Sequence, residues 1–393
     1  MGYVGSALTE AALDVNFEIL GFEINPDRVF QINNLGSPNL SATIDTKRLA
    51  ECDVICICVP TPIGENNKPD LSILKKVASN LSKNLKKGQL VILESSVAPG
   101  TTRNIVYPQL AKSQLEIGKD FFLAFSPERV DPGNNKYTVN NTPKIVSGIE
   151  RNSLKLVTNF YSSFVEKVYP VSTCEIAEMT KVLENTFRLV NISLVNEINQ
   201  YALSIGVDIW EVIKAASTKP FGFLPHYPGP GAGGDCIPVL PYHLLDAAKK
   251  KSIPLKVVEA AAKVNELQPK KVVDKAIELA NGKLANGHKL NVLLVGVAYK
   301  EETADIRQSP ALKIWKELEK SGITVSYHDP YVKKINGSTS QKINKSTLNS
   351  QDLIIITTAH RKVPYRTLVQ SMKPVIDTKN ILSKYRQPHI IKL

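Results

Sequence analysis

Cysteines are few in this chain and long apolar runs are missing, and both absences narrow the class of protein. The 393 residues include five cysteines, whose spacing lacks the pairing of a disulfide framework. No segment approaches the roughly 18 consecutive apolar residues that a membrane-spanning helix needs. The first residues are small and glycine-rich and include no basic stretch, so we expect no signal peptide. We therefore expect a protein of the reducing cytoplasm that has no membrane partner.

Aromatic residues that could stack on nucleic-acid bases are also missing beside the basic residues, although the formal charge of the chain is +12. A basic chain can bind nucleic acid, a membrane surface or an acidic small molecule. The lysines are spread along the sequence with only short clusters, such as Lys86 and Lys87, and this is typical of solvated helix faces. We expect no nucleic-acid partner, and the charge suits an anionic substrate.

Short apolar runs alternate with amphipathic segments in the first part of the chain. The pattern predicts strands at residues 17–23, 53–59, 90–94, 121–125 and 145–147, and a helix over residues 71–85. The continuous run DVICICV at 53–59 is typical of a strand that is buried on both faces. Strands that alternate with helices indicate βαβ units around a parallel sheet.

The centre of the chain is helical, and a second α/β block follows it. One long helix is predicted for residues 173–204, then a loop rich in proline and glycine over 219–241. Residues 244–280 are helical again, with Pro254 and Pro269 as boundaries or kinks. Near Asn291 a buried strand begins, Ser309 and Pro310 open a helix, and strands follow at 323–328, 353–357 and 375–377.

These segments predict an α/β protein with three domains. Two Rossmann-like, doubly wound parallel-sheet domains are expected at residues 1–170 and 283–393. A central helical domain containing the long helix is expected between them, at residues 171–282.

A glycine turn at the start of the chain matches half of a dinucleotide site. The full fingerprint is a strand, a G-x-G-x-x-G turn and a helix whose free N–H groups face the pyrophosphate. Gly2, Tyr3, Val4 and Gly5 supply only its last part, so the first strand and the first glycine are missing. That strand is central in the fold, and its neighbours would otherwise expose unpaired edges. We therefore expect the sequence to be a fragment whose start lies upstream.

An acidic residue at the end of the next strand favours NAD as the dinucleotide. Glu23 follows Gly5 by eighteen residues, where an acid hydrogen-bonds the ribose hydroxyls and repels the 2′-phosphate of NADP. The half fingerprint alone fits an ordinary strand-turn-helix equally well. Several strand ends that meet at one crevice favour the dinucleotide. The predicted NAD contacts are Gly2, Tyr3, Val4, Gly5, Glu23, Arg28, Pro60, Thr61 and Ser96.

One cysteine, Cys236, lies in the loop PFGFLPHYPGPGAGGDCIPVLPYHLL. Its glycines let backbone amides approach a ligand, and its prolines stiffen the loop. A thiol held in such a loop can attack an aldehyde once its thiolate is stabilised. The alternative, a buried structural thiol, fits Cys52, Cys56 and Cys58 better than Cys236.

Three other residues carry groups that suit oxyanion or proton-transfer chemistry. Lys181 and Asn185 lie four residues apart in the predicted long helix, so both can donate hydrogen bonds from one face to an oxyanion. The alternative is a solvated lysine beside a packing asparagine. Glu128 follows a strand and can take a proton or activate water, whereas the alternative is a surface pair with Arg129.

Taken together, the motifs resemble those of the UDP-glucose/GDP-mannose dehydrogenase family. GYVG, VPTP, SSVAPGTT, SPERVDPGN, KVLENTFRLVNISLVNE, YPGPGAGGDCIP, GVAYKEETADIRQSP and DTKN occur in order and cover essentially the whole chain. SPER-x-DPGN and YPGPG look closest to the branch that acts on UDP-N-acetylhexosamines, especially the UDP-N-acetylglucosamine 6-dehydrogenases. The resemblance implies a homodimer that oxidises a UDP-sugar C6 alcohol to the acid with two NAD, for surface-polysaccharide precursors.

The resemblance also implies roles for individual residues. Cys236 matches the nucleophile that forms a thiohemiacetal and then a thioester, and Lys181 and Asn185 match the oxyanion-stabilising pair. Glu128 matches a glutamate that assists proton transfer, and Ser96 stands where many members bind water through threonine. Contacts with the UDP-sugar are implied for Glu128, Arg129, Lys181, Asn185, Phe221, Phe223, Tyr227, Gly233, Lys300 and Arg307.

Several residues depart from the family pattern, besides the missing strand. Asp235 stands where this branch has histidine, and a carboxylate beside Cys236 tends to raise the thiol pKa. Leu240 replaces an aspartate thought to position the catalytic water, and Lys379 replaces an arginine and loses its bidentate fork. We expect slow hydrolysis of the thioester. UDP-N-acetylmannosamine or UDP-glucose as the substrate, and a sugar-nucleotide-binding protein without turnover, are the alternatives.

Overall fold

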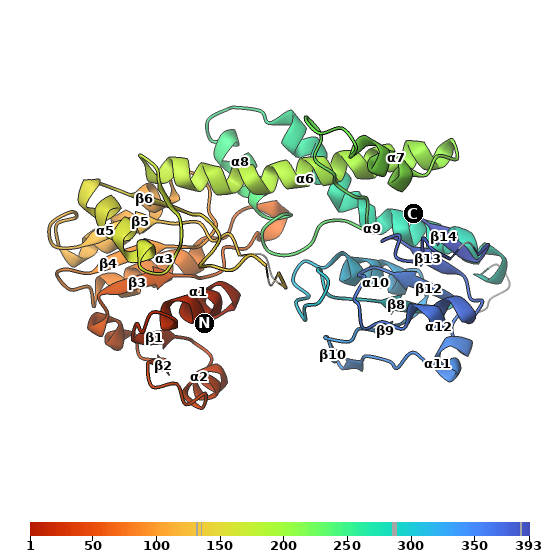
Figure 1. Cartoon of the computed structure of the whole chain (residues 1–393), viewed down its shortest axis with the longest axis horizontal. Helices are drawn as coiled ribbons and strands as arrows, with labels where there is room; N and C mark the ends of the chain where they lie inside the picture. The colour runs from red at the N-terminus through yellow and green to blue at the C-terminus, as the bar shows by residue number, and fades with distance from the viewer. Residues whose placement is uncertain (131–132, 135, 285–288, 386) are drawn as a thin grey trace. The chain divides into compact units, whose positions relative to one another are not determined.

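The computed structural model describes residues 1–130, 133–134, 136–284, 289–385 and 387–393. Asp131 and Pro132 of the SPERVDPGN motif lie outside the described residues. The chain divides into two compact units (Figure 1), the first of residues 1–184 and 242–253 and the second of residues 185–241 and 254–393. Among the described residues, no helix combines the length and apolar character needed to cross a membrane.

The first unit contains a five-stranded sheet and a separate pair of strands. The sheet has the order β3 (Val54–Ile57), β4 (Leu90–Leu93), β5 (Phe122–Phe125), β6 (Lys144–Gly148) and β7 (Val168–Pro170). Strands β1 (Ile19–Phe22) and β2 (Leu40–Thr43) form a parallel pair. Among the described residues no strand joins β1 to β3.

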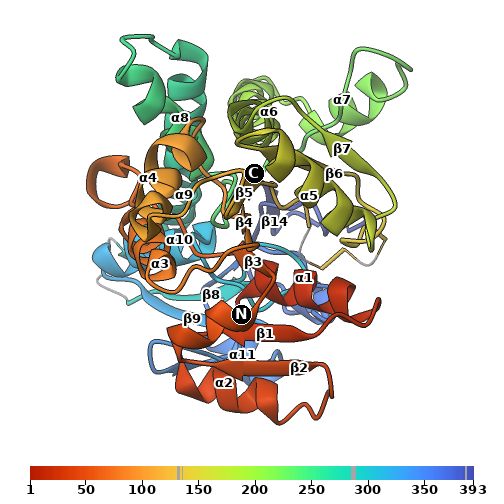
Figure 2. The same cartoon turned by 90° about the vertical axis from the view of Figure 1, so that its left-hand side faces the viewer.

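Helices cover both faces of this sheet. The helices are α1 (Tyr3–Leu13), α2 (Pro26–Asn33), α3 (Ser72–Ser82), α4 (Tyr107–Leu110) and α5 (Arg151–Ser162), with short turns η1 (Thr46–Glu51), η2 (Glu65–Asn67), η3 (Thr102–Val106) and η4 (Ala111–Ser113). Leu74 of α3 packs with Val91 and Leu93 on one face, whereas Val157 of α5 packs with Ile92 on the other. Figure 2 shows α3 and α5 on opposite sides of β4 and β5.

Two details of the first unit differ from the prediction. Strands β5 and β6 pair antiparallel, with Phe125 opposite Ser147, so the sheet is not parallel throughout. Strand β3 has only alternate residues, Ile55 and Ile57, buried, so the expected burial on both faces is wrong there. The physical reason is that β3 pairs on one side only, with β4.

The second unit contains a fully parallel sheet. Its order is β14 (Ile390–Lys392), β13 (Val375–Asp377), β12 (Leu353–Ile356), β8 (Asn291–Val295) and β9 (Thr324–His328). A small antiparallel pair, β10 (Lys334–Ile335) and β11 (Ser338–Thr339), lies outside it. The helices are α7 (Ile209–Ala216), α9 (Lys256–Leu284), α10 (Pro310–Lys320), α11 (Lys345–Asn349) and α12 (Tyr365–Gln370). The predicted α/β class with Rossmann-like sheets is confirmed.

Two helices run from one unit into the other. Helix α6 (Cys174–Ser204) passes the boundary at Asn185, and α8 (Leu240–Lys249) passes it at Tyr242. Pro254 lies between α8 and α9, as predicted for a boundary. Pro269 lies inside α9 and bounds no helix, so the other alternative, a kink, stays a prediction for it. Asparagine and serine side chains cap α2 and α10, each with proline as the first helical residue.

Candidate active site

The carboxyl ends of β3 and β4 are tied together by hydroxyl groups. The Ser95 hydroxyl donates hydrogen bonds to the carbonyls of Ile57 at 3.2 Å and Val59 at 2.7 Å. The Thr61 hydroxyl donates to the Ser96 carbonyl at 2.7 Å. Two of the predicted NAD-binding residues, Thr61 and Ser96, are therefore in contact, at the edge where open α/β sheets bind ligands.

The amino end of α1 suits a pyrophosphate. Its cap residue, Gly2, provides no side-chain hydrogen bond to the helix, and the first turn contains no acidic residue. A Cβ added to Gly2 would meet no described atom within 4 Å, whereas Gly5 approaches the Cβ of Cys58. Tyr3 is exposed and Val4 is half-buried. A helix amino end without a side-chain cap, with open space beside Gly2, fits the anionic part of a dinucleotide.

Glu23 directly follows β1, where an acid that binds ribose is expected. One of its oxygens accepts the N–H groups of Ile24 at 2.8 Å and Asn25 at 3.2 Å. The other pairs with the amino group of Met1 at 3.0 Å. Arg28 is exposed on α2 and donates a hydrogen bond to Gln31 at 3.4 Å.

Glu128 follows β5 and is buried, with 7% of its surface exposed. Its Oε1 accepts the N–H groups of Arg129 and Val130, both at 2.7 Å, and its Oε2 accepts from Lys144 Nζ at 3.1 Å. Burial raises the pKa of Glu128, but the Lys144 ammonium and the two N–H groups together bring this pKa below its ordinary value. The surface pair of Glu128 with Arg129, offered as the alternative, is not formed. The carboxylate is instead held as a buried anion.

Lys144 connects Glu128 to a second buried carboxylate that the sequence analysis missed. The Lys144 ammonium lies 2.8 Å from Oε2 of Glu94, the residue that follows β4. The hydroxyl of Tyr161 donates to the other Glu94 oxygen, and Lys144 Nζ lies 5.0 Å from the centre of the Tyr161 ring. Burial raises the pKa of Glu94 and Tyr161. A lysine inside an apolar strand and a glutamate after VIL were the only sequence signals.

Arg129 turns away from Glu128 and toward α6. It donates to the carbonyl of Pro143 at 2.9 Å and forms an ion pair with Glu184. Its Nε is buried and has no hydrogen-bond partner among the residues that the structure describes. The arginine therefore fixes the loop after β5 to the turn of α6 that precedes Asn185.

Lys181 and Asn185 lie one turn apart on α6, as predicted, and Lys181 is half-buried. Asn185 is 8% exposed, and its buried Nδ2 has no hydrogen-bond partner within the described parts of the chain. A buried donor without a partner is costly, so this amide suits a ligand oxygen. The packing role offered as the alternative does not account for the unpaired amide.

A further buried glutamate, Glu178, fixes α6 to the SSVAPGTT segment. It accepts the N–H of Gly100 at 2.5 Å and both the N–H and the hydroxyl of Thr102 at 2.7 Å. Burial raises the pKa of Glu178 to about 7, and the hydrogen bonds from Thr102 and Gly100 oppose this rise. The sequence analysis assigned this residue no role.

Residues 219–241 form the loop that carries Cys236, which we call the thiol loop. It belongs to the second unit and is fixed at several points. Gly229 N–H donates to Asn196 at 2.9 Å, Ala232 N–H donates to Asn265 at 2.7 Å, and Gly234 N–H donates to the Arg307 carbonyl at 3.0 Å. Cys236 is exposed at the end of this loop, one turn before α8.

Only glycine fits at the two positions that precede Asp235. A Cβ on Gly233 would lie 2.7 Å from the Cβ of Tyr299 and 2.9 Å from the Gln308 carbonyl. A Cβ on Gly234 would lie 2.9 Å from the Tyr299 ring, and its φ of +84° disfavours side chains. The loop therefore packs directly on the backbone that leads from β8 to α10.

Asp235 and Leu240, the two residues near Cys236 that differ from the family pattern, have different surroundings. Asp235 pairs with Arg307 at 2.5 Å, and Arg307 also pairs with Asp305 at 2.5 Å. Burial raises the pKa of Asp235, and Arg307 opposes the rise. Leu240 is 1% exposed and begins α8, so an apolar group fills the place where the family has a carboxylate. Arg307, predicted to bind the substrate, is engaged by two carboxylates.

Aromatic side chains of the same loop are exposed. Phe221 is 69% exposed and Tyr227 is 50% exposed, and Tyr227 stacks on Trp210 with ring centres 5.2 Å apart. Phe223 is also exposed, and Lys300 is half-buried after β8. Exposed aromatic surface on a fixed loop suits contact with a ligand.

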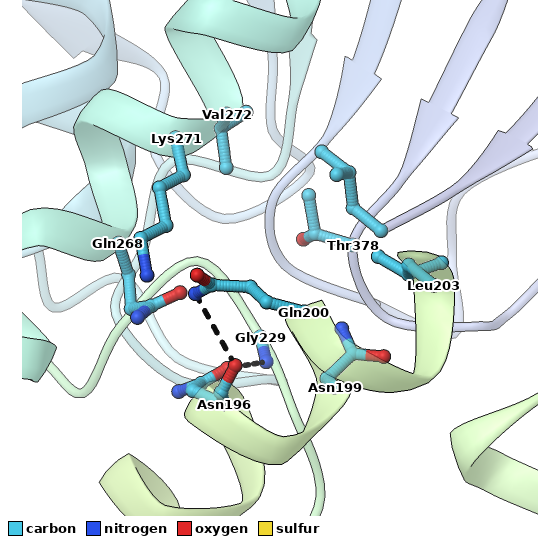
Figure 3. A pocket seen from close by; sticks show the side chains of 10 residues that line it. Asn196, Asn199, Gln200, Leu203, Gly229, Gln268, Lys271, Val272 and Thr378 are labelled. Atoms are coloured by element: carbon cyan, nitrogen blue, oxygen red, sulfur yellow. Dashed lines mark hydrogen bonds between the residues drawn. The ribbon is translucent and has the colours of Figure 1, made fainter. Parts of the chain in front are cut away.

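A pocket of the second unit borders this loop at Gly229 (Figure 3). Side chains of α6 and α9 line it, together with Thr378 after β13 and the last residue of the chain: Asn196, Asn199, Gln200, Leu203, Gln268, Lys271, Val272, Thr378 and Leu393. The buried Nδ2 of Asn196 has no partner in the described part of the molecule. Amide groups and apolar side chains therefore share the lining of a pocket beside the backbone of the thiol loop.

The predicted site residues fall into two groups, one in each unit. The first unit holds the NAD residues, Glu128, Arg129 and Lys181, and the second holds Asn185, Cys236 and the other predicted sugar-nucleotide residues. Thr61 with Ser96, and Gly233 with the Arg307 segment, are brought together.

Comparison with known proteins matches three parts of the chain. Models of the UDP-glucose/GDP-mannose dehydrogenase family match residues 32–165 as NAD binding domain, 175–267 as central domain and 293–384 as UDP binding domain. The chain is 33% identical to Protein CapL of Staphylococcus aureus, over 98% of this chain and 95% of that protein. It is 33% identical to UDP-N-acetyl-D-glucosamine 6-dehydrogenase of Pseudomonas aeruginosa, over 84% of this chain and 82% of that protein.

Solved structures show the same similarity. The structure of UDP-D-ManNAc dehydrogenase from Pyrococcus horikoshii superposes with a TM-score of 0.89 at 29% identity, covering 100% of this chain and 97% of that one. The UDP-N-acetyl-mannosamine dehydrogenase Cap5O from Staphylococcus aureus gives a TM-score of 0.84 at 26% identity, covering 100% and 95%.

Proposed function

The chain belongs to the UDP-glucose/GDP-mannose dehydrogenase family, and we propose on that premise that it oxidises UDP-N-acetylglucosamine at C6 to the uronic acid. It is an NAD-dependent dehydrogenase of UDP-N-acetylhexosamines. Relatives named for the glucosamine and the mannosamine sugar are 33% and 31% identical, so similarity does not choose between them. The SPER-x-DPGN and YPGPG motifs support the N-acetylhexosamine branch, and UDP-N-acetylmannosamine stays the alternative substrate.

The residues of the first unit fit NAD. The open amino end of α1 with Gly2 and Gly5 suits the pyrophosphate, Glu23 suits the ribose, and Thr61 and Ser96 line the adjoining strand ends. NAD supplies a hydride acceptor for each of the two oxidations. An acid at Glu23 disfavours the additional phosphate of NADP.

Cys236 is the proposed nucleophile, and one observation carries this proposal. An exposed thiol ends a loop that is fixed by backbone hydrogen bonds and by close packing of Gly233 and Gly234 on Tyr299. Its thiolate adds to the C6 aldehyde carbon, and the adduct becomes a thioester when it is oxidised. Water then adds to the thioester carbonyl, the C–S bond breaks, and the thiolate and the acid are released.

Lys181 and Asn185 are proposed to stabilise the oxygen that becomes negative in these steps. The unpaired Nδ2 of Asn185 supports this role, because a ligand oxygen would satisfy it. Glu128 is proposed to accept the proton of the attacking water, since it is held as an anion with backbone N–H groups fixing its direction.

Hydrolysis of the thioester is proposed to be the slow step. Leu240 offers no carboxylate to the water, and Asp235 pairs with Arg307. Rapid mixing with UDP-N-acetylglucosamine and NAD should give a burst of NADH, with an acyl group on Cys236 detected by mass spectrometry. A linear course without an acylated enzyme would contradict this part of the proposal.

A homodimer is proposed through the exposed apolar stripe of α6. Ile176, Met179, Leu183, Phe187, Leu194 and Ile198 recur at helical spacing, and each is exposed by more than a third. Such a stripe suits the same stripe of a second copy. Sedimentation of the wild type as a dimer and of the Leu183→Glu variant as a monomer would support it, and a monomeric wild type would contradict it.

A panel of nucleotide sugars tests the function as a whole. NADH formation is measured with UDP-N-acetylglucosamine, UDP-N-acetylmannosamine and UDP-glucose, and the proposal expects the highest kcat/KM for the first, with two NADH per sugar. A preference for the mannosamine sugar would change the substrate and keep the chemistry. Binding of all three without NADH would leave the sugar-nucleotide-binding alternative. A reducing-cytoplasm location and a role in supplying surface-polysaccharide precursors are proposals that follow from the enzyme reading.

A further inference from the structure

A buried cluster of three charges surrounds Glu128 in the first unit. The Lys144 side chain, 3% exposed, lies 2.8 Å from Glu94 Oε2 and 3.1 Å from Glu128 Oε2. Glu94 and Glu128 come from the carboxyl ends of β4 and β5, and Lys144 from the first residue of β6. One ammonium therefore joins two carboxylates at the sheet edge where ligands of such folds bind.

The contacts leave Glu128 with little freedom. An ionised carboxylate has about four acceptor positions, and three are used by Arg129 N–H, Val130 N–H and the Lys144 ammonium. The carboxylate plane is thereby fixed, and about one acceptor position is left for a water molecule or a substrate hydroxyl.

Stability alone is a poor reason for such a cluster. Taking three charges out of water costs free energy that their attraction rarely exceeds, and apolar residues of similar volume often serve as well. The cluster carries one ammonium and two carboxylates, so a negative charge is left uncompensated. This arrangement suits a site that must keep one carboxylate ready to accept a proton.

We propose that Lys144 is a positioning residue, which keeps Glu128 ionised and aimed at the attacking water, and that Glu94 limits this effect by competing for the same ammonium. The proposal rests on the proposed role of Glu128. It deepens that role because Leu240 provides no carboxylate for the water.

Every element packed around Glu128 contributes to its environment. Lys144 of β6 favours the anion, and Glu94 after β4 disfavours it. Cys58, after β3, has a thiol whose pKa is raised by burial and by Glu94, so it adds no charge. Arg129, next in sequence, is neutralised by Glu184 of α6. The two side chains that dominate therefore act in opposite directions.

Because Lys144 and Glu94 act in opposite directions, their variants should shift the protonation of Glu128 in opposite directions. A purely structural role of Lys144 does not predict this result. Protonation of Glu128 is followed in the resting protein by infrared absorption of the carboxyl group as the pH falls, with the Glu128→Gln variant subtracted to assign the band. Lys144→Met should raise the midpoint by about one pH unit or more. Glu94→Gln should lower it, and Lys144→Arg should keep it near the wild-type value.

The same variants are then compared in the rate of thioester hydrolysis against pH. The pH below which hydrolysis slows should move together with the infrared midpoint. KM for the UDP-sugar should change by less than roughly twofold, since no step of binding uses the Lys144 charge. Because Lys144→Met leaves two carboxylates without a partner, the double variant Lys144→Met with Glu94→Gln serves as the folded reference. It should show a raised midpoint too.

The outcomes separate the two proposals. Midpoints that stay unchanged, or that shift in the same direction in Lys144→Met and Glu94→Gln, would overturn the role of Lys144. Opposite shifts in the resting protein without any NADH formation would keep that role and refute the proposed function. Opposite shifts of the midpoint with an unmoved hydrolysis profile would refute the link between them.

Discussion

The surroundings of Glu128 and of Cys236 differ in almost every physical respect. Glu128 is buried, and its direction is fixed by an ammonium on a neighbouring strand and by N–H groups of its own loop. Cys236 is exposed, and its loop is fixed by amide hydrogen bonds and by two glycines packed on Tyr299. In the first region charge determines the geometry, and in the second region shape determines it. Substitutions that alter charge should therefore act mainly on the first region, and those that alter volume on the second.

Removing the thiol is the largest expected effect and tests the second region directly. Cys236→Ser should lower uronic-acid formation by roughly a thousandfold or more, because no thioester forms without sulfur. Quenched samples analysed for the acid give the rate. Cys52→Ser, in a half-buried thiol of the first unit, is the matched control and should stay near wild type. A normal rate in Cys236→Ser would end the thioester proposal.

Neutralising the carboxylate is the corresponding change in the first region. Glu128→Gln should lower hydrolysis by about a hundredfold, since the amide accepts the backbone N–H groups but takes no proton from water. Single-turnover measurements should then show acyl-enzyme that persists. Glu116→Gln, in an exposed carboxylate that pairs with Lys119, should change nothing. Equal rates for both variants would remove Glu128 from the chemistry.

A single methyl group tests whether shape governs the thiol loop. Gly233→Ala should cost about 1–3 kcal/mol of unfolding free energy, because its Cβ would overlap Tyr299. Gly229→Ala is the matched control in the same loop, where a Cβ meets only ordinary contacts at 3.7 Å and 3.9 Å. Urea denaturation compares the two. A Gly233→Ala variant as stable as Gly229→Ala would show that the loop shifts to accommodate the added Cβ at little cost in free energy.

The pH dependence of stability gives a smaller effect, at Glu178 on α6. Its pKa of about 7 in the folded chain exceeds the ordinary 4.5, so the folded state holds the proton longer. Stability should therefore fall as pH rises from about 4.5 to 7, by at most about 1.4 kcal/mol per unit. Glu178→Gln should flatten this slope in thermal melts. Glu175→Gln is the control with the opposite sign. Burial raises the pKa of Glu175, but the Arg103 guanidinium and the hydrogen bonds to this carboxylate together bring the pKa below its ordinary value.

The smallest effect is expected at the half-exposed pair of Asp235 with Arg307. Asp235→Asn should change the unfolding free energy by less than about 1 kcal/mol, as is usual for exposed pairs. It should nevertheless speed alkylation of Cys236 by iodoacetamide, because a neighbouring negative charge is removed. Asp305→Asn removes the other partner of Arg307 without changing the residue beside the thiol. Slower alkylation in Asp235→Asn alone would mean that the pair activates Cys236.

The sequence predicted apolar strands well and polar strands poorly. Runs such as those of β3, β4, β8 and β12 were found because several adjacent residues are apolar. The strands β2 (LSAT), β7 (VYP) and β14 (IIK) were not, because each mixes its few apolar residues with polar residues or proline and depends on pairing with a neighbour. The antiparallel pairing of β5 with β6 likewise has no local signal.

Residue types in the site were predictable, but their partners were not. Glu128 was chosen for its carboxylate, yet its pairing with Lys144 depends on two strands being adjacent in the sheet. Asp235 was expected to disturb the thiol, whereas its contact with Arg307 spans about seventy residues of sequence. Such contacts follow from strand order and loop packing, which no single segment encodes.

The contacts of the thiol loop with Tyr299 and Arg307 also determine when the loop can become ordered during synthesis of the chain. Residues 229–236 leave the ribosome well before residues 299–307, against which Gly233 and Gly234 pack. A nascent chain therefore carries Cys236 on a segment without its final support until the second sheet begins to form. A chain that ends before residue 299 should expose a thiol that alkylates like that of an unstructured peptide, so reactivity at this position would report how far synthesis has advanced.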